Sequence, residues 1–171
     1  RQGELDMTIS SLPVVVPDDL EVIELMHDDV CMVARHGHPL LANRRLKVSD
    51  LAAVQWMLPG PGVAARRHVE ARLAQAGLPP PRIALEVSNT SGQMGQILRE
   101  TDLVSIMSES MLTGSSGQGL EVLPLAQARI RRVVGISLLK QVRQQPLTTR
   151  FAQLLVQTAP VPVDVKPLDA L

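Results

Sequence analysis

The sequence predicts an α/β fold, in which strands and helices alternate along the chain. Ile83, Leu85 and Val87 alternate with other residues, as in a buried strand, and a helical pattern follows directly. The run 30–34 is apolar throughout, which is typical of a strand covered on both faces. Strand and helix patterns then recur in turn, which predicts a parallel or mixed sheet with helices on both faces.

The elements are expected in a regular order. Alternating or continuous apolar residues predict strands at 7–9, 20–26, 30–34, 55–58, 83–87, 103–107, 120–125 and 132–139. Apolar residues at helical spacing predict helices at 63–76, from the serine-rich turn after Val87 to about Thr101, and at 147–158, with short helical turns at 48–52 and near Ser110. Gly77 is the expected C-cap of the helix 63–76. The tail 159–171 has Pro at short intervals and is expected to be extended or disordered.

Composition excludes several classes of protein. The chain has 171 residues, of which 45% are hydrophobic, which indicates a globular protein with a substantial core. Its 17 basic and 17 acidic residues leave no net charge to attract DNA or an anionic membrane. No apolar run approaches the ~18–20 residues of a membrane span, and no signal segment precedes the first strand. We therefore expect a soluble, cytoplasmic chain that does not contact membranes.

The first residues of the chain indicate a truncation, and its one cysteine indicates a reducing compartment. The chain begins at Arg1 without Met, with a segment that looks like the end of a helix running into a strand, so we expect an N-terminal truncation. Cys31 is the only cysteine, so no disulfide can form within the chain. Because it lies in an apolar run, it is expected to be a buried, inert thiol of a reducing compartment.

Polar residues follow several of the predicted strands. The run Ser88 to Ser91 joins a strand to a helix, and Ser10 and Ser11 form the loop after the first strand. In an α/β sheet such turns offer unpaired N–H groups and hydroxyls to a ligand. Helix capping alone would also explain the run 88–91. We expect these turns to form one wall of a small-molecule site.

Catalytic and metal chemistry find little support. His36 and His38 flank a glycine in a turn, and no carboxylate or cysteine lies at a ligand-like offset, so no metal site is expected. The segment 114–119 has the composition of a phosphate loop, but no Lys-Ser/Thr and no helix follow it, which favours a mobile connection. No Gly-x-Ser-x-Gly elbow and no positioned Cys–His pair occur. No catalytic residue and no cofactor are therefore expected.

The remaining charged side chains on helices and strands have structural interpretations. His27 and His68 stand alone on secondary elements and are interpreted as structural. Arg66, Arg67 and Arg72 could form a basic patch, but acidic Glu70 lies among them and aromatic platforms are absent. A solvated helix face, or part of a subunit contact, is the preferred interpretation.

Taken together, the segments resemble the effector-binding domain of a LysR-type transcriptional regulator, over about residues 1 to 158. The resemblance rests on the order and spacing of Gly3-Glu4-Leu5-Asp6-Met7-Thr8-Ile9, Val30 to Ala34 followed by His38-Pro39-Leu40, Val48-Ser49-Asp50-Leu51-Ala52 with Trp56-Met57-Leu58-Pro59, Val122-Leu123-Pro124-Leu125 and Arg132-Val133-Val134-Gly135. It implies a fold like the type 2 periplasmic binding proteins, with two α/β lobes joined by two crossover segments and the effector in the cleft.

The same resemblance implies a division of the chain. Crossings near 35–38 and 132–136 would make 38–133 one lobe, and 1–37 with 134–158 an incomplete other lobe, followed by the Pro-rich tail 159–171. Family members usually begin this domain with two further strand–helix units, and precede it with a winged helix-turn-helix on a linker helix. The sequence contains none of these, so the pocket is expected to be only partly built.

Carried onto this sequence, the pocket positions implied by the family lie in both lobes. They are Ser10 and Ser11 in one lobe, and Gly60, Pro61, Asn89, Thr90, Ser91 and Ser108 in the other. Many members have a Gly-containing turn before the strand at Leu103 and a Pro after it, where this chain has Thr101-Asp102 and Ser108. The identity of the effector therefore cannot be transferred.

The function implied is effector sensing in a bacterial transcription regulator. A small metabolite, such as a sugar or an organic acid, would bind between the lobes, and DNA would be contacted only through the missing N-terminal domain. The helix 63–76 resembles the one that the family uses in antiparallel dimers, so a homodimer or homotetramer is expected. The alternatives are a solute-binding protein of a transporter, which shares this fold, and an enzyme on the same scaffold.

Overall fold

The computed structural model describes residues 5–13, 15–43, 45–88, 92–140 and 145–159. The chain forms two compact units, and it passes between them twice. Unit 1 comprises residues 1–28 and 132–171, and unit 2 comprises residues 29–131. Among the described helices, none has the length and apolar character needed to cross a bilayer.

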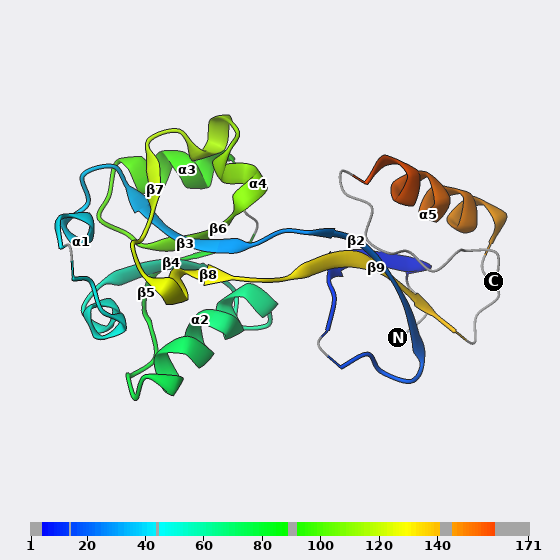
Figure 1. Ribbon diagram of the computed structural model, residues 1–171, viewed down its shortest axis with the longest axis horizontal. Helices are drawn as coiled ribbons and strands as arrows, with labels where there is room; N and C mark the ends of the chain where they lie inside the picture. Colours follow the sequence, from blue (N-terminus) through cyan, green and yellow to red (C-terminus); the bar gives the residue numbers. More distant parts are fainter. Residues whose placement is uncertain (1–4, 14, 44, 89–91, 141–144, 160–171) are drawn as a thin grey trace. The chain divides into compact units, whose positions relative to one another are not determined.

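Unit 1 contains a three-stranded antiparallel sheet in the order β1 (Met7–Ser11), β9 (Val133–Leu139) and β2 (Leu20–His27). Helix α5 (Pro146–Thr158) packs on one face of this sheet through Ala152, which is buried against Ile23, Ile136 and Leu138 (Figure 1). Strand β9 lies in the middle and pairs with both neighbours over most of its length. It therefore fixes the positions of β1 and β2 relative to each other.

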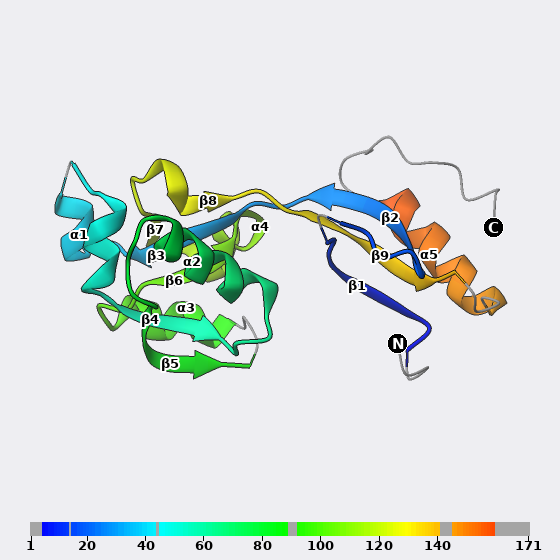
Figure 2. The ribbon, with the colours of Figure 1, turned by 90° about the horizontal axis from the view of Figure 1, so that it is seen from below.

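Unit 2 is built around β3 (Val30–Arg35), which pairs antiparallel with β6 (Ser105–Ser108), β7 (Leu120–Val122) and β8 (Arg129–Ile130). Strands β4 (Gln55–Pro59) and β5 (Arg82–Val87) run parallel to each other, as Figure 2 shows. A parallel bridge between Trp56 and Val104 links β4 to the approach of β6. Short helices α1 (Pro39–Ala42) and α4 (Glu109–Leu112) and three 3₁₀ turns (Val48–Ala52, Ser115–Gly117 and Ala126–Ala128) connect the strands.

Helices cover both faces of the unit 2 sheet (Figure 1). Helix α2 (Ala64–Gln75) packs on one face with Trp56 and Leu58 of β4, and α3 (Gly92–Arg99) packs on the other with Met57. Strand β3 divides its side chains in the same way, since Met32 belongs to the first core and Cys31 to the second. Because successive side chains of β3 enter opposite cores, both faces of the strand are buried, which explains the continuous apolar run 30–34. The arrangement confirms the predicted α/β class with helices on both faces of the sheet.

The boundaries of the two units differ from the predicted lobes. The first crossing lies at residues 28/29 rather than at 35–38, because all pairing partners of β3 belong to unit 2. The turn after β3 is also held in unit 2, where His36 N donates to Gly119 O at 2.8 Å. The second crossing lies at residues 131/132, which assigns Val133 to unit 1 because β9 pairs with β1 and β2.

Three strands also differ from their predicted character. Strand β5 is not buried: within the described part of the chain it pairs only with β4, and Leu85 is 36% exposed. Ser10 and Ser11 belong to β1 rather than to a loop, because they pair with Gly135 and Val134 of β9. Strand β8 was missed, since its two residues carry no pattern of their own. The predicted tail lies outside the described residues beyond Ala159.

Candidate functional site

The carboxyl ends of three strands meet at one edge of unit 2. Strands β4 and β5 are parallel, and β4 is also parallel to the approach of β6. Gly60, Ser88 and Ser108 follow or end these strands, so they lie along the same edge. Loops at such an edge form the ligand sites of α/β sheets. The structure therefore brings together the predicted positions Gly60, Pro61 and Ser108 within this unit.

The crossing segments enter unit 2 at this same edge. Val30, the first residue of β3, pairs with Ser108 on one side and with Ile130 of β8 on the other. The N–H of Glu109, which opens α4, donates to the carbonyl of Asp29 at 2.8 Å. Glu109 also forms an ion pair with Arg129, which raises the pKa of that guanidinium. A group bound near Ser108 would thus lie beside both segments that leave the unit.

Ser108 is half-buried at the end of β6 and serves as the N-cap residue of α4. Its side chain makes no capping hydrogen bond, and its Oγ lies 3.1 Å from Ser110 Oγ. By contrast, the hydroxyl of Ser105 is fully buried and donates to Met57 O at 2.6 Å, so it joins β6 to β4. Of the two serines, only Ser108 has a hydroxyl that could reach a ligand.

Arg66 holds the Gly60-Pro61 turn in place. Its Nη1 donates to Pro59 O at 3.2 Å and to Glu86 Oε2 at 2.9 Å, and its Nε donates to Glu70 Oε1 at 2.8 Å. The hydrogen bond to Glu70 raises the pKa of Arg66 against the opposing effect of desolvation. This guanidinium ties α2 to the ends of β4 and β5. Arg66 is therefore not part of a solvated face, which corrects the sequence interpretation, whereas Arg67 and Arg72 are exposed.

In unit 1, Ser10 and Ser11 lie at the end of β1. Both residues line a cavity of about 580 Å³, together with Asp6, Thr8, Ser137 and apolar residues of and near β1, β2 and β9. A volume of this size suits a small-molecule ligand, since such pockets span roughly 300–1,000 Å³. All of the described residues that line the cavity belong to unit 1.

Sequence reasoning missed a charged cluster beside Ser11. The Arg132 guanidinium forms an ion pair with the Asp28 carboxylate, donates from Nε to Asp28 O at 3.0 Å, and donates from Nη1 to Ser11 Oγ at 3.3 Å. The backbone adds a hydrogen bond of 3.1 Å from Asp28 N to Arg132 O. Arg132 and Ser11 are 121 residues apart in sequence, so no local signal could have paired them.

The remaining positions singled out in the sequence do not contribute described side chains to either place. Asn89, Thr90 and Ser91 lie outside the described residues. His38 is buried at the N-cap of α1, where Nδ1 accepts from Leu40 N at 3.1 Å and Nε2 faces Asp102 O at 3.1 Å. Both ring nitrogens thus have protein partners, which gives His38 a structural role at this turn. In the described ranges, no group of three or more His, Cys, Asp or Glu side chains is placed to hold a metal ion.

The chain is similar to known transcriptional regulators. The family model "LysR substrate binding domain" matches residues 1–160. The HTH-type transcriptional regulator GbpR of Azospirillum brasilense is 33% identical over 113 residues, covering 65% of this chain and 33% of that protein. The HTH-type transcriptional regulator GalR of Pseudomonas putida is 28% identical over 137 residues, covering 80% of this chain and 34% of that protein. The chain thus spans about a third of the length of these curated relatives.

Solved structures show the same fold at low sequence identity. The regulatory domain of Synechocystis PCC6803 CcmR, in complex with 2-PG, matches with a TM-score of 0.75 and 19% identity, over 92% of this chain and 74% of that chain. The effector-binding domain of QuiR, in complex with shikimate, matches with a TM-score of 0.70 and 20% identity, over 91% and 72% of the two chains. These matches confirm the predicted fold. Because the family model covers nearly the whole sequence, the chain belongs to the LysR substrate-binding domain family.

Proposed function

We propose that this chain is the effector-sensing region of a bacterial LysR-type transcription regulator, acting in the cytoplasm, where such a regulator meets DNA. The observation that carries the proposal is the shared edge of unit 2, where the carboxyl ends of three strands and both crossing segments come together. The relatives named above are HTH-type transcriptional regulators, and two similar structures hold the small molecules 2-PG and shikimate. Neither relatives nor structures favour the transporter alternative.

The residues that we propose for effector binding are Ser10 and Ser11 in unit 1, and Gly60, Pro61, Asn89, Thr90, Ser91 and Ser108 in unit 2. A ligand that prefers one arrangement of the units shifts the equilibrium only by its differential affinity, a coupling of typically ~1–3 kcal/mol. The intact protein would pass this change to a DNA-binding domain. We propose binding without turnover, since the sequence offers no nucleophile–base pair of known pattern.

A thermal-shift screen of sugars and organic acids tests this proposal. A ligand at 100 times its Kd stabilises the folded chain by about 2.7 kcal/mol, which raises the melting temperature measurably. We expect at least one metabolite to do so and to remain chemically unchanged after incubation. A screen without a stabilising metabolite, or one in which the metabolite is consumed, would count against an effector-sensing role.

Asn89→Ala and Thr90→Ala should each weaken binding of that metabolite about tenfold or more, because a ligand group left without its partner costs about 1–3 kcal/mol. The unfolding midpoint should change little in either variant. Isothermal titration calorimetry measures the affinity, and urea unfolding measures the stability. Ser49→Ala is the matched control, since this exposed serine lies in the 3₁₀ turn that precedes the amino end of β4. Wild-type affinity in both variants would remove these residues from the site.

We further propose that the chain self-associates through the edge formed by β5 and α2 in unit 2. Among the described residues, one edge of strand β5 pairs with no other strand, and the exposed side chains of Leu85 and Val63 lie on β5 and just before α2. Free strand edges with exposed apolar side chains favour pairing with another chain. Sedimentation equilibrium should show a dimer for the wild type and a monomer for Leu85→Lys. A monomeric wild type would contradict this part of the proposal.

A further inference from the structure

A cavity in unit 2 lies at the amino ends of the parallel strands, opposite the edge that forms the candidate effector site. Its volume of about 470 Å³ falls within the roughly 300–1,000 Å³ typical of small-molecule sites. It is lined by the start of α1 and its N-cap, by residues 53–55 at the start of β4, and by residues 101–103 after α3, all of which belong to unit 2. Gln55 opens β4 and Gly60 follows its last residue, so roughly 16 Å of strand separates the cavity from the Gly60-Pro61 turn. A ligand in this cavity would therefore not occupy the candidate effector site.

Most of the cavity wall is apolar, and its buried histidine has no unengaged ring nitrogen. His38 Nδ1 accepts from Leu40 N at 3.1 Å, and His38 Nε2 lies 3.1 Å from Asp102 O. The apolar residues that line the cavity are Pro39, Leu40, Ala53, Val54 and Leu103. The cavity therefore suits a ligand with an apolar body, which would leave water on binding.

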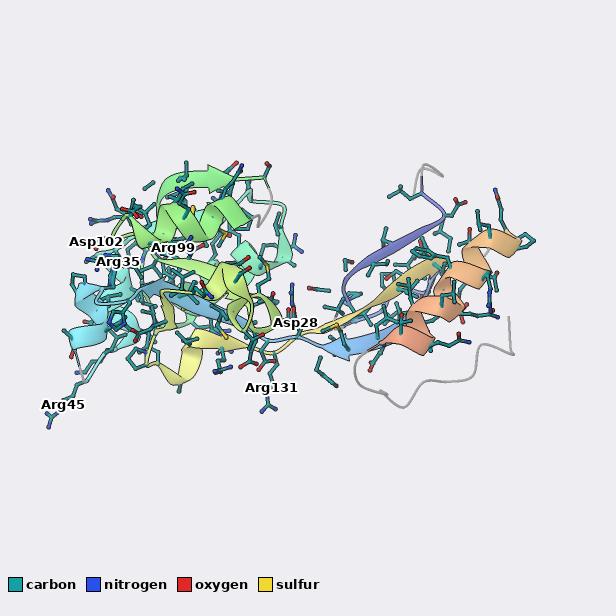
Figure 3. The ribbon with its side chains drawn as sticks, turned by 90° about the horizontal axis from the view of Figure 1, so that it is seen from above. Asp28, Arg35, Arg45, Arg99, Asp102 and Arg131 are labelled. Atoms are coloured by element: carbon teal, nitrogen blue, oxygen red, sulfur yellow. The ribbon has the colours of Figure 1, made fainter. Side chains whose placement is uncertain are left out.

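The polar side chains of the lining are mainly hydrogen-bond acceptors. Thr101 Oγ1 donates to Ile97 O at 2.8 Å, so its lone pairs are left for a ligand. Arg35 Nε and Nη2 both contact Asp102 Oδ1, at 2.9 and 2.7 Å, and these two side chains lie side by side in Figure 3. Within the described ranges, no hydrogen bond or ion pair reaches Asp102 Oδ2. Among the described side chains of the lining, only the Gln55 amide can still donate.

The charge of the lining favours a cation. Asp102 is the only Asp, Glu, Lys or Arg among the described residues that line the cavity, and its side chain is 62% exposed. An ammonium group can approach Asp102 Oδ2 directly, because the guanidinium of Arg35 is bound to the other carboxylate oxygen. A carboxylate ligand would face Asp102 with only the Gln55 amide to donate to it, which is unfavourable.

We propose that this cavity is a second ligand site, which binds a small primary amine with an apolar body. The ammonium group donates to Asp102 Oδ2 and Thr101 Oγ1, and the apolar body packs on the apolar side chains of the wall. Asp102 thereby sets the preference for a cation. The site goes beyond effector sensing, because it lies at the other edge of unit 2 and takes a ligand of different chemistry.

Two sets of matched ligands test the proposed class. Cyclohexylmethylamine, cyclohexylmethanol and cyclohexanecarboxylate share one ring and differ in the polar group, as do benzylamine, benzyl alcohol and benzoate. Each is titrated into the 15N-labelled 171-residue chain and followed by the amide resonances of Leu40, Gln55 and Leu103. At least one amine should shift these resonances with a Kd on the order of 1 mM or below. It should bind about tenfold or more tightly than its carboxylate, with the alcohol between them.

Three results would overturn the proposal. They are equal or tighter binding of the carboxylates, equal binding of amine and alcohol, and the absence of shifts at these three amides with either amine. Each of these results would leave the effector-sensing function standing, because the effector is sought by a separate screen and bound by other residues.

Asp102→Asn separates a role in ligand selectivity from a structural one. The substitution keeps an acceptor but removes the charge, so the ratio of amine to alcohol affinity should fall about tenfold. A purely structural role would lower both affinities together and leave the ratio unchanged, which would contradict the proposal. Glu100→Gln is the matched control, because Glu100 is exposed and stands two residues away without lining the cavity. An equal fall of the ratio in Glu100→Gln would indicate general electrostatic attraction and would also overturn the assignment of Asp102.

Ala53→Trp tests where the amine binds. Ala53 is exposed and lines the cavity, so an indole at this position would fill the space that the apolar body needs. Amine binding should weaken about tenfold or more, whereas the urea unfolding midpoint should stay close to that of the wild type. Wild-type amine affinity in this variant would place the ligand elsewhere and overturn the proposed site.

Discussion

Replacing Gly135 with alanine should destabilise unit 1 by at least about 3 kcal/mol, the upper end of the range for overpacked cores. A Cβ at this position would lie 2.3 Å from Ile23 O and 2.7 Å from Leu12 Cδ1. Gly135 is in β9, the central strand of the sheet, and it pairs with Ser10. Neither neighbouring strand can move away without breaking its pairing with β9, so the clash cannot be relieved locally.

Urea unfolding followed by far-UV circular dichroism measures this loss. Trp56 is the only tryptophan and lies in unit 2, so its fluorescence should show that unit 2 keeps its fold in the variant. Gly62→Ala is the matched control, because a Cβ there would meet nothing within 4 Å. A Gly135→Ala protein within about 0.5 kcal/mol of wild type would show that β1 and β2 do not pack against β9 as described.

Trp56→Ala should destabilise unit 2 by about 3–5 kcal/mol. Trp56 is fully buried in β4, where it packs with Leu58, Val69 and Leu73 and connects the sheet to α2. Because Gly60 and Pro61 follow directly after β4, the same variant should also lose effector binding through unit 2. Urea unfolding followed by circular dichroism measures the loss of stability, and calorimetric titration measures the loss of effector affinity.

Trp56→Phe separates packing from hydrogen bonding at this position. The indole N–H of Trp56 is buried without a hydrogen-bond partner among the described residues. Its removal therefore forfeits no hydrogen bond, and only the smaller ring volume costs stability, about 1–2 kcal/mol. A loss as large as that of Trp56→Ala would mean that the indole N–H has a partner in solution.

Strongly patterned elements could be predicted from the sequence, and elements defined by their partners could not. The run 30–34 and the helix at 147–158 carry their own periodicity, and the structure places β3 and α5 there. The turn Gly37-His38-Pro39 has the same breaker residues as a hinge, yet it is an ordinary turn inside unit 2. Its place depends on the pairing of β3, which no local pattern encodes.

The candidate site shows the same division. Polar residues after strands indicated Ser108 and the Gly60-Pro61 turn, because strand ends can be recognised locally. Arg66 and Arg132 were missed as positioning side chains, since their partners Glu86 and Asp28 lie 20 and 104 residues away. Such contacts exist only after the chain has folded. The candidate ligand-binding loops can therefore be predicted from the sequence more readily than the arginines that hold these loops in place.

The central proposal is that the chain binds one small-molecule effector, and calorimetric titration of the effector found by screening tests it most directly. The wild type should bind one ligand per chain, and Ser10→Ala in unit 1 and Asn89→Ala in unit 2 should each weaken that one event about tenfold, with Ser49→Ala unchanged. If only one of these two variants binds the effector more weakly, or if neither does, the result would contradict the account.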